Sequence, residues 1–229
     1  MAIARSHKRI TRKDLRQPDW FQITTEHALE LYRDHRVKVI AAVVLLAIVL
    51  AALWGWDLYR ERQNIRASAE FGRAIGFYQS GKHAEAIAAF ENVTAYRWSP
   101  YARFAYLYQA NGYLALSEPD KALAAAQRFL AGTAENTLYR QIGLVTLAHV
   151  EERQGRLKEA LQHYTDAERI NAAYRERALL GKARTSEQAG DLKGAIAAYR
   201  EYVRENAGSP YGLKIAELEA KLAAASDGK

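Results

Sequence analysis

Four pairs of alanines recur along the chain beyond residue 70, and the two members of each pair stand twelve residues apart. A glycine or serine follows each first alanine by seven residues, and in three of the four units an aromatic residue follows the second alanine by four. The second alanines are spaced 36, 38 and 35 residues apart. Because a short helix pair can bury its apolar face only against a neighbouring pair, this repeat predicts stacked helix–turn–helix units. The pattern residues are Ala74, Gly81, Ala86 and Phe90; Ala110, Ser117, Ala122 and Ala126; Ala148, Gly155, Ala160 and Tyr164; and Ala183, Gly190, Ala195 and Tyr199.

Composition and helix boundary signals favour an all-α fold. The chain is rich in alanine and has only four prolines, three of which stand at predicted helix boundaries. Ser99 and Ser209 precede prolines as helix N-caps do, and Asn136 and Asn171 are expected to cap the first helices of the third and fourth units. The segment after Pro210 predicts an amphipathic helix that caps the end of the stack. Its apolar side is expected to carry Leu213, Ala216, Leu218 and Leu222.

These residues resemble the tetratricopeptide repeat, a helix–turn–helix unit of about 34 residues with small residues where its helices touch. The segments AIGFYQSGKHAEAIAAF, LAHVEERQGRLKEALQHY and KARTSEQAGDLKGAIAAY match it at the small, turn, small and aromatic positions. The second unit departs from it at Ser117 and Ala126, so its turn is expected to be looser. The resemblance implies an all-α solenoid of four helix pairs, which together with the capping helix covers residues 67–224. Residues 225–229 are expected to form a disordered tail.

An uncharged stretch of 18 residues, Val39 to Trp56, predicts a transmembrane helix. At about 1.5 Å per residue it covers roughly 27 Å, close to the ~30 Å hydrocarbon core of a bilayer. The alternatives are a buried core helix and a cleavable signal peptide, although the latter would need a charged leader of 38 residues. Residues 57–66 contain neither glycine nor proline and predict a helical linker. The expected membrane-interface residues are Arg36, Lys38, Trp54, Trp56 and Tyr59.

The segment before the apolar stretch predicts the orientation of the anchor. Residues 1–38 carry nine basic side chains, against four in the first 20 residues beyond the stretch. Because cytoplasmic flanks are enriched in lysine and arginine, we expect a cytoplasmic N-terminus and repeats outside the cytoplasm. Residues 23–35 predict a short interfacial helix, and the basic arm is expected to contact anionic lipid. DNA binding by the arm is disfavoured, since no recognition fold accompanies it.

The chain lacks the motifs of common catalytic and cofactor sites. It has no cysteine, HExxH, P-loop, G-x-G-x-x-G or G-x-S-x-G sequence. His149 and Glu152 could form an acid–base pair, but a solvated pair on a helix face is the simpler interpretation. We therefore predict no catalytic residue, no metal site, no cofactor and no enzymatic activity.

The remaining candidate site is the face of the first helix of each unit, opposite the packing alanines. Aromatic rings with a few polar groups suit an extended or helical peptide, although the rings could instead complete the core. The carboxylate clamp of this repeat family needs lysine and asparagine where Phe71 and Ile75 stand, so binding of a free C-terminus is not expected. The candidate peptide-groove residues are Phe71, Tyr78, Phe104, Tyr108, Asn111, Val145, His149, Arg153 and Arg184.

The layout of one N-terminal span, a basic arm and a repeat solenoid resembles that of bacterial inner-membrane proteins related to the ancillary subunit of the Sec translocon. This resemblance implies a single-pass periplasmic, chaperone-like scaffold. Its partners would be translocon subunits, a periplasmic chaperone or exported chains, and not nucleic acid. The alternatives are a scaffold for a cell-wall, outer-membrane or energy-transducing assembly, and an inverted anchor with cytoplasmic repeats.

Overall fold

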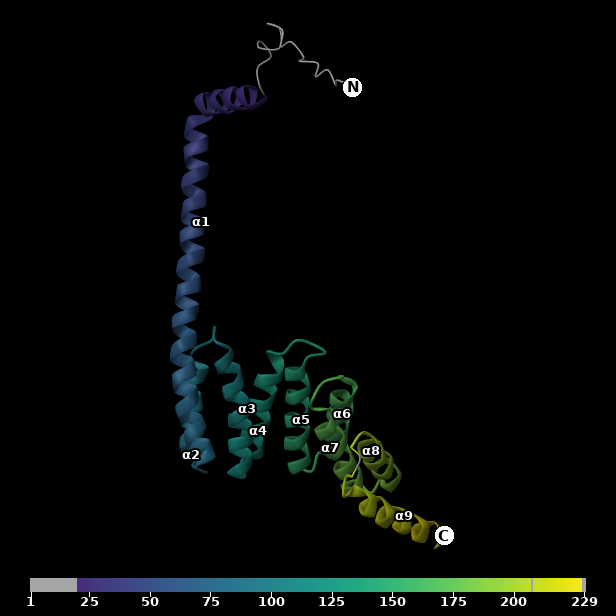
Figure 1. Ribbon diagram of the computed structural model, residues 1–229. Coiled ribbons are helices and arrows are strands. Elements are labelled where there is room, and N and C mark those ends of the chain that lie inside the picture. The colour runs from purple at the N-terminus through teal and green to yellow at the C-terminus, as the bar shows by residue number, and fades with distance from the viewer. Residues whose placement is uncertain (1–19, 207, 228–229) are drawn as a thin grey trace, which may run out of the picture. The chain divides into compact units, whose positions relative to one another are not determined.

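The computed structural model describes the backbone of residues 20–206 and 208–227, and the side chains of residues 35–206 and 208–225. Over these residues it contains nine α-helices and no strand, which confirms the all-α prediction (Figure 1). The chain divides into two compact units, Met1–Tyr59 and Arg60–Lys229. The helices are α1 (Trp20–Gln79), α2 (His83–Thr94), α3 (Pro100–Ala115), α4 (Pro119–Ala131), α5 (Leu138–Arg153), α6 (Leu157–Arg169), α7 (Arg175–Gln188), α8 (Leu192–Glu205) and α9 (Tyr211–Asp227).

The first compact part of the chain, Met1–Tyr59, contains the N-terminal part of α1, whose helical backbone is interrupted at His35 (φ −125°, ψ 25°). The predicted interfacial segment 23–35 ends at this interruption, and most of its side chains, like the whole basic arm, lie outside the described residues. The segment His35–Gln79 is long and apolar enough to span a membrane. Its most apolar stretch has a mean hydropathy of 2.7, and the described part of the chain buries none of that stretch.

Apolar side chains are exposed around the whole circumference of this stretch. Eight of them between Val43 and Leu53 are large aliphatic side chains, so every face of the helix is apolar; they are Val43, Val44, Leu45, Leu46, Ile48, Val49, Leu50 and Leu53. A helix that is apolar all round is stable only when protein or lipid covers it. Among the predicted interface residues, Arg36, Lys38, Trp54, Trp56 and Tyr59 are all exposed. The predicted linker 57–66 lies within α1.

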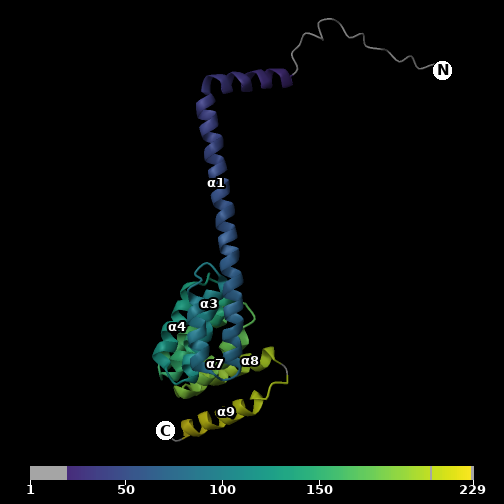
Figure 2. The ribbon, with the colours of Figure 1, turned by 90° about the vertical axis from the view of Figure 1, so that its left-hand side faces the viewer.

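In the compact unit Arg60–Lys229 each helix from α2 to α9 packs against the next helix in chain order (Figure 1). Figure 2 shows the same helices from a direction in which successive pairs overlap. First helices also pack on first helices, since α3 contacts α5 and α5 contacts α7. This order of contacts is that of a solenoid of helix pairs, each touching only its neighbours.

The repeated alanines lie where the helices cross. All eight are fully buried, so adjacent helices can approach closely. The aromatic residues of the pattern, Phe90, Tyr164 and Tyr199, are buried beside them, and Ala126 is buried at the corresponding position of the second unit. The helix-crossing core is therefore built from the residues that define the repeat.

The turn inside each helix pair has the same left-handed backbone in all four units. Gly81, Gly155 and Gly190 have φ of 73°, 75° and 79°, and Ser117 has φ of 59°. The expectation of a looser second turn is wrong, because Glu118 N–H donates to Tyr113 O at 2.8 Å as Lys82 N–H donates to Phe77 O at 3.0 Å. Serine there costs about 1 kcal/mol or more of backbone strain that glycine avoids.

Two predicted helix caps are wrong, and two are confirmed. Ser99 accepts a hydrogen bond from Tyr101 N–H at the start of α3, and Ser209 accepts one from Tyr211 N–H at the start of α9. The cap of α5 is Thr137, which accepts from Arg140 N–H, while Asn136 has a left-handed backbone (φ 54°) in the preceding turn. Asn171 lies upstream of α7, whose N-cap residue, Tyr174, has no side-chain cap.

The packed face of the final helix, α9, contains two of the four predicted residues, Leu218 and Leu222. Leu218 is fully buried, and Tyr211, Ile215 and Leu222 pack beside it, at the spacing of one helix face. Leu213 is 85% exposed and Ala216 is also exposed, so their predicted place on the packed side is wrong. α9 also continues to Asp227, beyond the predicted end at residue 224.

Candidate functional site

Three of the four aromatic residues of the predicted groove, Phe71, Tyr78 and Tyr108, meet in one cluster on α1, α2 and α3. Tyr108 stacks on buried Phe90 with ring centroids 5.3 Å apart, and it contacts Phe71 and Tyr78 edge-on at 5.5 and 5.4 Å. Phe71 also contacts Phe90 at 5.4 Å. All three predicted rings are half-buried, so each contributes to the core of the first two units and also presents an edge to solvent.

Phe104 belongs to a second aromatic group one unit further along. Its ring lies 5.3 Å from exposed Tyr139 and 6.3 Å from buried Phe129. Asn111 is half-buried, and Val145 is half-buried against the cluster of Ala148, Ala160 and Tyr164. The structure therefore divides the predicted groove into separate aromatic groups.

The polar part of the face is organised around Glu152, whose side chain is 6% exposed. Arg184 donates two hydrogen bonds to it, from Nε to Oε1 at 2.5 Å and from Nη2 to Oε2 at 2.7 Å. Tyr164 Oη donates to Oε2 at 3.1 Å, and Gln188 Nε2 donates to Oε1 at 3.3 Å. These bonds connect α5 and α6 of the third unit to α7 of the fourth.

These contacts shift the titration of the groups involved. Burial raises the pKa of Glu152, but the hydrogen bonds and charge of Arg184 outweigh it, so the pKa of that carboxyl lies below its ordinary value. The hydrogen bond to Glu152 raises the pKa of Arg184. Burial, together with the negative charge of Glu152, raises the pKa of Tyr164. The cluster is therefore an ionised carboxylate held by a cation and a neutral phenol.

His149 and Arg153, the other predicted polar residues, are exposed. The pKa of His149 lies below its ordinary value, chiefly because of desolvation. The negative charge of Glu152 raises that pKa, and the positive charges of Arg184 and Arg153 lower it. Arg153 lines a small hollow of about 130 Å³ with Leu114, Ser117 and Pro119. Since Arg184, Tyr164 and Gln188 occupy the Glu152 carboxylate, it is engaged in structure and is not set up as a base for His149.

Buried polar residues that sequence analysis missed connect successive units. Gln141 is fully buried, donates to the carbonyls of Ala167 and Ile170 at 3.0 and 2.7 Å, and accepts from Tyr174 N–H at 2.8 Å. Glu151, also buried, lies 2.6 Å from His163 Nδ1. The sequence signal that could have predicted them is a polar residue at a helix position that is otherwise apolar. Among the described residues no group of three His, Cys, Asp or Glu could hold a metal ion.

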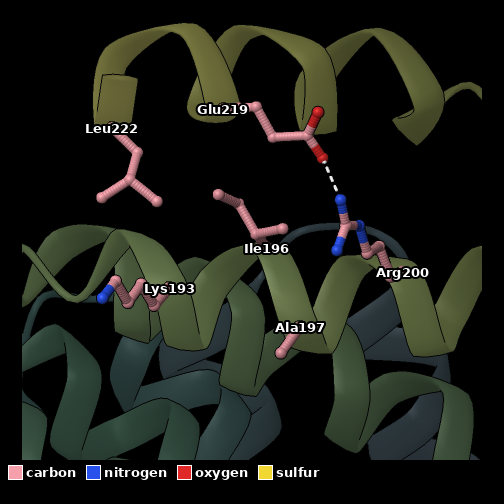
Figure 3. A pocket seen from close by; sticks show the side chains of 6 residues that line it. All are labelled: Lys193, Ile196, Ala197, Arg200, Glu219 and Leu222. Carbon is pink, nitrogen blue, oxygen red and sulfur yellow. Dashed lines mark hydrogen bonds and ion pairs between the residues drawn. The ribbon is translucent and has the colours of Figure 1, made fainter. Parts of the chain in front are cut away.

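Two further hollows lie away from this face. One, of about 250 Å³, lies between α8 and α9, where Arg200 Nη2 donates to Glu219 Oε1 at 2.6 Å beside Ile196 and Leu222 (Figure 3). The other, of about 310 Å³, lies where the α2–α3 loop meets the end of α4 and is lined by Arg97, Arg103 and Arg128.

The stacked helix pairs define an α-solenoid. The chain belongs to the tetratricopeptide repeat family. A family model described as a tetratricopeptide repeat-like domain matches residues 30–169, and a tetratricopeptide repeat model matches residues 145–210. Tetratricopeptide repeats form protein-interaction scaffolds and are typically not catalytic.

Solved structures with the same fold have low sequence identity to this chain. One is from the functional characterisation of Pseudomonas aeruginosa pilF, at 20% identity and a TM-score of 0.60, covering 69% of this chain and 70% of that one. Another is a Podosopora anserina putative kinesin light chain with nearly identical repeats, at 17% identity and a TM-score of 0.57, covering 72% and 88%. No curated protein matches the chain.

Proposed function

We propose that this chain is a single-pass protein of the bacterial inner membrane whose repeats form a chaperone-like scaffold in the periplasm, beside the protein-export translocon. Its partners are translocon subunits, a periplasmic chaperone or exported chains. The anchor holds the scaffold at the membrane, and the face made by the first helices contacts the partner.

The observation that carries the proposal is an apolar helix, exposed on all its faces, in the same chain as a repeat scaffold. None of its most apolar stretch is covered by the described residues, and lipid would cover it without further protein. The family match begins at residue 30, ahead of the apolar stretch, and runs through three of the four repeated alanine pairs. This extent supports a function in which the anchor and the repeats act together.

The first-helix face supports the binding of peptide segments. Half-buried rings at Phe71, Tyr78 and Tyr108 present apolar edges on a fixed support, and exposed His149 and Arg153 add polar groups further along. Rigid aromatic groups give contact area at little entropic cost, which favours capture of extended or helical segments. The periplasmic location and the translocon follow from the basic arm and from the resemblance in layout.

Site-specific photo-crosslinking in intact cells tests this proposal. A photoreactive phenylalanine analogue replaces Arg153, which is exposed on the first-helix face, in the full-length chain. The matched control carries the same analogue at Lys158, which is exposed on α6. We expect translocon subunits or exported chains to be crosslinked from position 153 and enriched severalfold over position 158, as measured by quantitative mass spectrometry.

Other outcomes of the same experiment contradict particular parts of the proposal. Crosslinks to cell-wall or outer-membrane assembly proteins would mean that the partner is one of those assemblies and not the translocon. Crosslinks to cytoplasmic proteins alone would mean that the anchor has the opposite orientation. Equal recovery from positions 153 and 158 would remove the first-helix face as the contact surface.

A further inference from the structure

The hollow beside α3 and the end of α4, the second helix pair, is lined by three arginines from different elements. Arg97 belongs to the α2–α3 loop, Arg103 to α3 and Arg128 to the last turn of α4. We propose that this arginine hollow binds the phosphate group of an anionic membrane lipid. The remaining lining residues are Thr94, Ser99, Ala102, Tyr106 and Gly132, so no carboxylate lines it.

The positive charge of the hollow is uncompensated within the described chain. None of the three guanidinium groups lies within ion-pair distance of a described carboxylate, and all three arginines are exposed. Other arginines of the chain are neutralised by a carboxylate, since Arg175, Arg184 and Arg200 each pair with glutamate. Planar guanidinium groups match phosphate oxygens with two parallel hydrogen bonds, so three of them around one hollow suit a phosphate ligand.

Two of the three arginine side chains, Arg128 and Arg103, lie against neighbouring residues. The Arg128 guanidinium lies over the Tyr106 ring, 5.7 Å from its centroid. Arg103 runs along Gly132, where an added Cβ would come within 3.2 Å of its Nε. Gly132 therefore leaves the space through which Arg103 reaches the hollow. A site with restrained side chains loses less conformational entropy when it binds its ligand.

The surroundings of the hollow favour a lipid headgroup over a soluble anion. Trp98, next to Arg97, is 54% exposed, and tryptophan and arginine are both favoured at membrane interfaces. The same loop is bonded to α1, because Ser99 Oγ donates to Asn64 Oδ1 at 2.9 Å. Asn64 follows Trp56, the end of the apolar stretch, by eight residues. The preference for a lipid headgroup rests on the proposed membrane anchor. It does not depend on the orientation of the anchor or on the identity of the protein partner.

Native mass spectrometry of the full-length chain in detergent micelles tests the inference. Phosphatidylglycerol is added to the wild type and to a variant with all three arginines of the hollow replaced by glutamine. A basic residue at an anionic surface strengthens binding roughly fivefold, so we expect the triple variant to bind this lipid at least about tenfold more weakly. Phosphatidylcholine should bind both proteins weakly. The matched control removes the same charge from exposed positions of the later units, by Lys158→Gln, Arg177→Gln and Lys193→Gln.

Two single variants probe the geometry without changing the net charge. Gly132→Ala should displace Arg103 and weaken phosphatidylglycerol binding, and Trp98→Ala should weaken it through the interface contact. Circular dichroism checks that each variant keeps its helical content. The basic arm contributes the same background binding to every protein in the series.

Several results would overturn the inference. Equal weakening in the two triple variants would mean general charge attraction without a site. Displacement of phosphatidylglycerol by inorganic phosphate would identify a free-anion site, and preference for a polyglutamate peptide would identify an acidic protein segment. A wild-type chain that does not insert into liposomes would contradict the proposed anchor instead.

Discussion

Gly72 and Gly181 occupy the same position of the repeat, two residues before a packing alanine, yet their surroundings differ. A Cβ at Gly72 would meet nothing within 4 Å, whereas a Cβ at Gly181 would come within 2.2 Å of the Tyr164 ring. Tyr164 cannot easily move aside, because it is 1% exposed and its hydroxyl donates to Glu152. Gly181 is thus required by one ring of the preceding unit.

The variant Gly181→Ala should destabilise the protein by about 1 to 3 kcal/mol, the usual cost of overpacking. Gly72→Ala should instead be neutral or stabilising by about 0.5 to 1 kcal/mol, because alanine is the better helix former. Thermal unfolding of the full-length chain in detergent, followed by circular dichroism, measures both. Similar melting temperatures for the two variants would show that Tyr164 does not pack on Gly181.

Glu152→Gln should lower stability by about 1 to 2 kcal/mol at neutral pH, since the bond to half-exposed Arg184 is partly screened by solvent. The folded-state pKa of Glu152 is depressed, so its contribution is present above the unfolded-state value of about 4.3 and is lost as pH falls through the folded value. The difference between wild type and variant should therefore shrink below about pH 4.

Urea unfolding at neutral and acidic pH measures this difference. Glu159→Gln is the control, because that carboxylate is exposed on α6 and should change stability much less. A wild-type advantage that stays constant down to the acid limit would mean that Arg184 does not stabilise the ionised carboxylate.

At the residue scale, the sequence predicts contacts set by the repeat and misses those set by the stacking of units. The alanines and turn glycines are recognisable because each recurs at a fixed spacing. Glu152 and Arg184 are 32 residues apart and pair because two first helices pack side by side. The cap of α5 was missed by one residue, because Asn136 adopts the left-handed turn conformation and leaves the N-cap position to Thr137.

At the element scale, the second helix of the third unit, α6, provides a test of the helix register. Ala160 is fully buried where α6 meets α5, and Lys158, two residues earlier, is exposed. Ala160→Trp should cost about 1 to 3 kcal/mol or more through overpacking. Lys158→Trp should stay within about 0.5 kcal/mol of the wild type. Equal shifts in the melting temperature of the two full-length variants would mean that the face of α6 assigned to the core is wrong.

Helix existence was predictable for every described unit, and the orientation of the last helix was not. In α2 to α8 the alanine pairs and turns fix which face is buried. α9 lies outside the four alanine pairs, and its alanines and leucines are spread around the helix. The buried face is then decided by contact of Tyr211 with Tyr199 and Tyr202, whose ring centroids lie 5.1 and 5.3 Å away. The candidate binding face was predictable only as a set of positions, because half-buried rings serve both core and surface.

At the scale of the whole molecule, the distribution of charge decides which side of a membrane each part would occupy. Nine of the 33 basic residues lie in the first 38 positions, while the apolar stretch has no charge. Short flanks rich in lysine and arginine remain in the cytoplasm, whereas a long folded part is translocated largely regardless of its charge. In the proposed orientation, the exposed tryptophans Trp54 and Trp56 would lie at the outer interface.

A reporter that is active only outside the cytoplasm, fused after Lys229, should therefore be active. Protease added to spheroplasts should degrade the chain beyond about residue 57 and leave a membrane-protected N-terminal fragment, because only the repeats would be accessible. Replacing the arginines and lysines of residues 1–38 with glutamine removes the flank's positive charge, and a substantial share of molecules should then insert in the opposite orientation. A fusion that is active only as a cytoplasmic reporter in the unaltered chain would reverse the orientation and exclude a periplasmic scaffold, while leaving the lipid-binding arginine hollow to be judged by its own experiment.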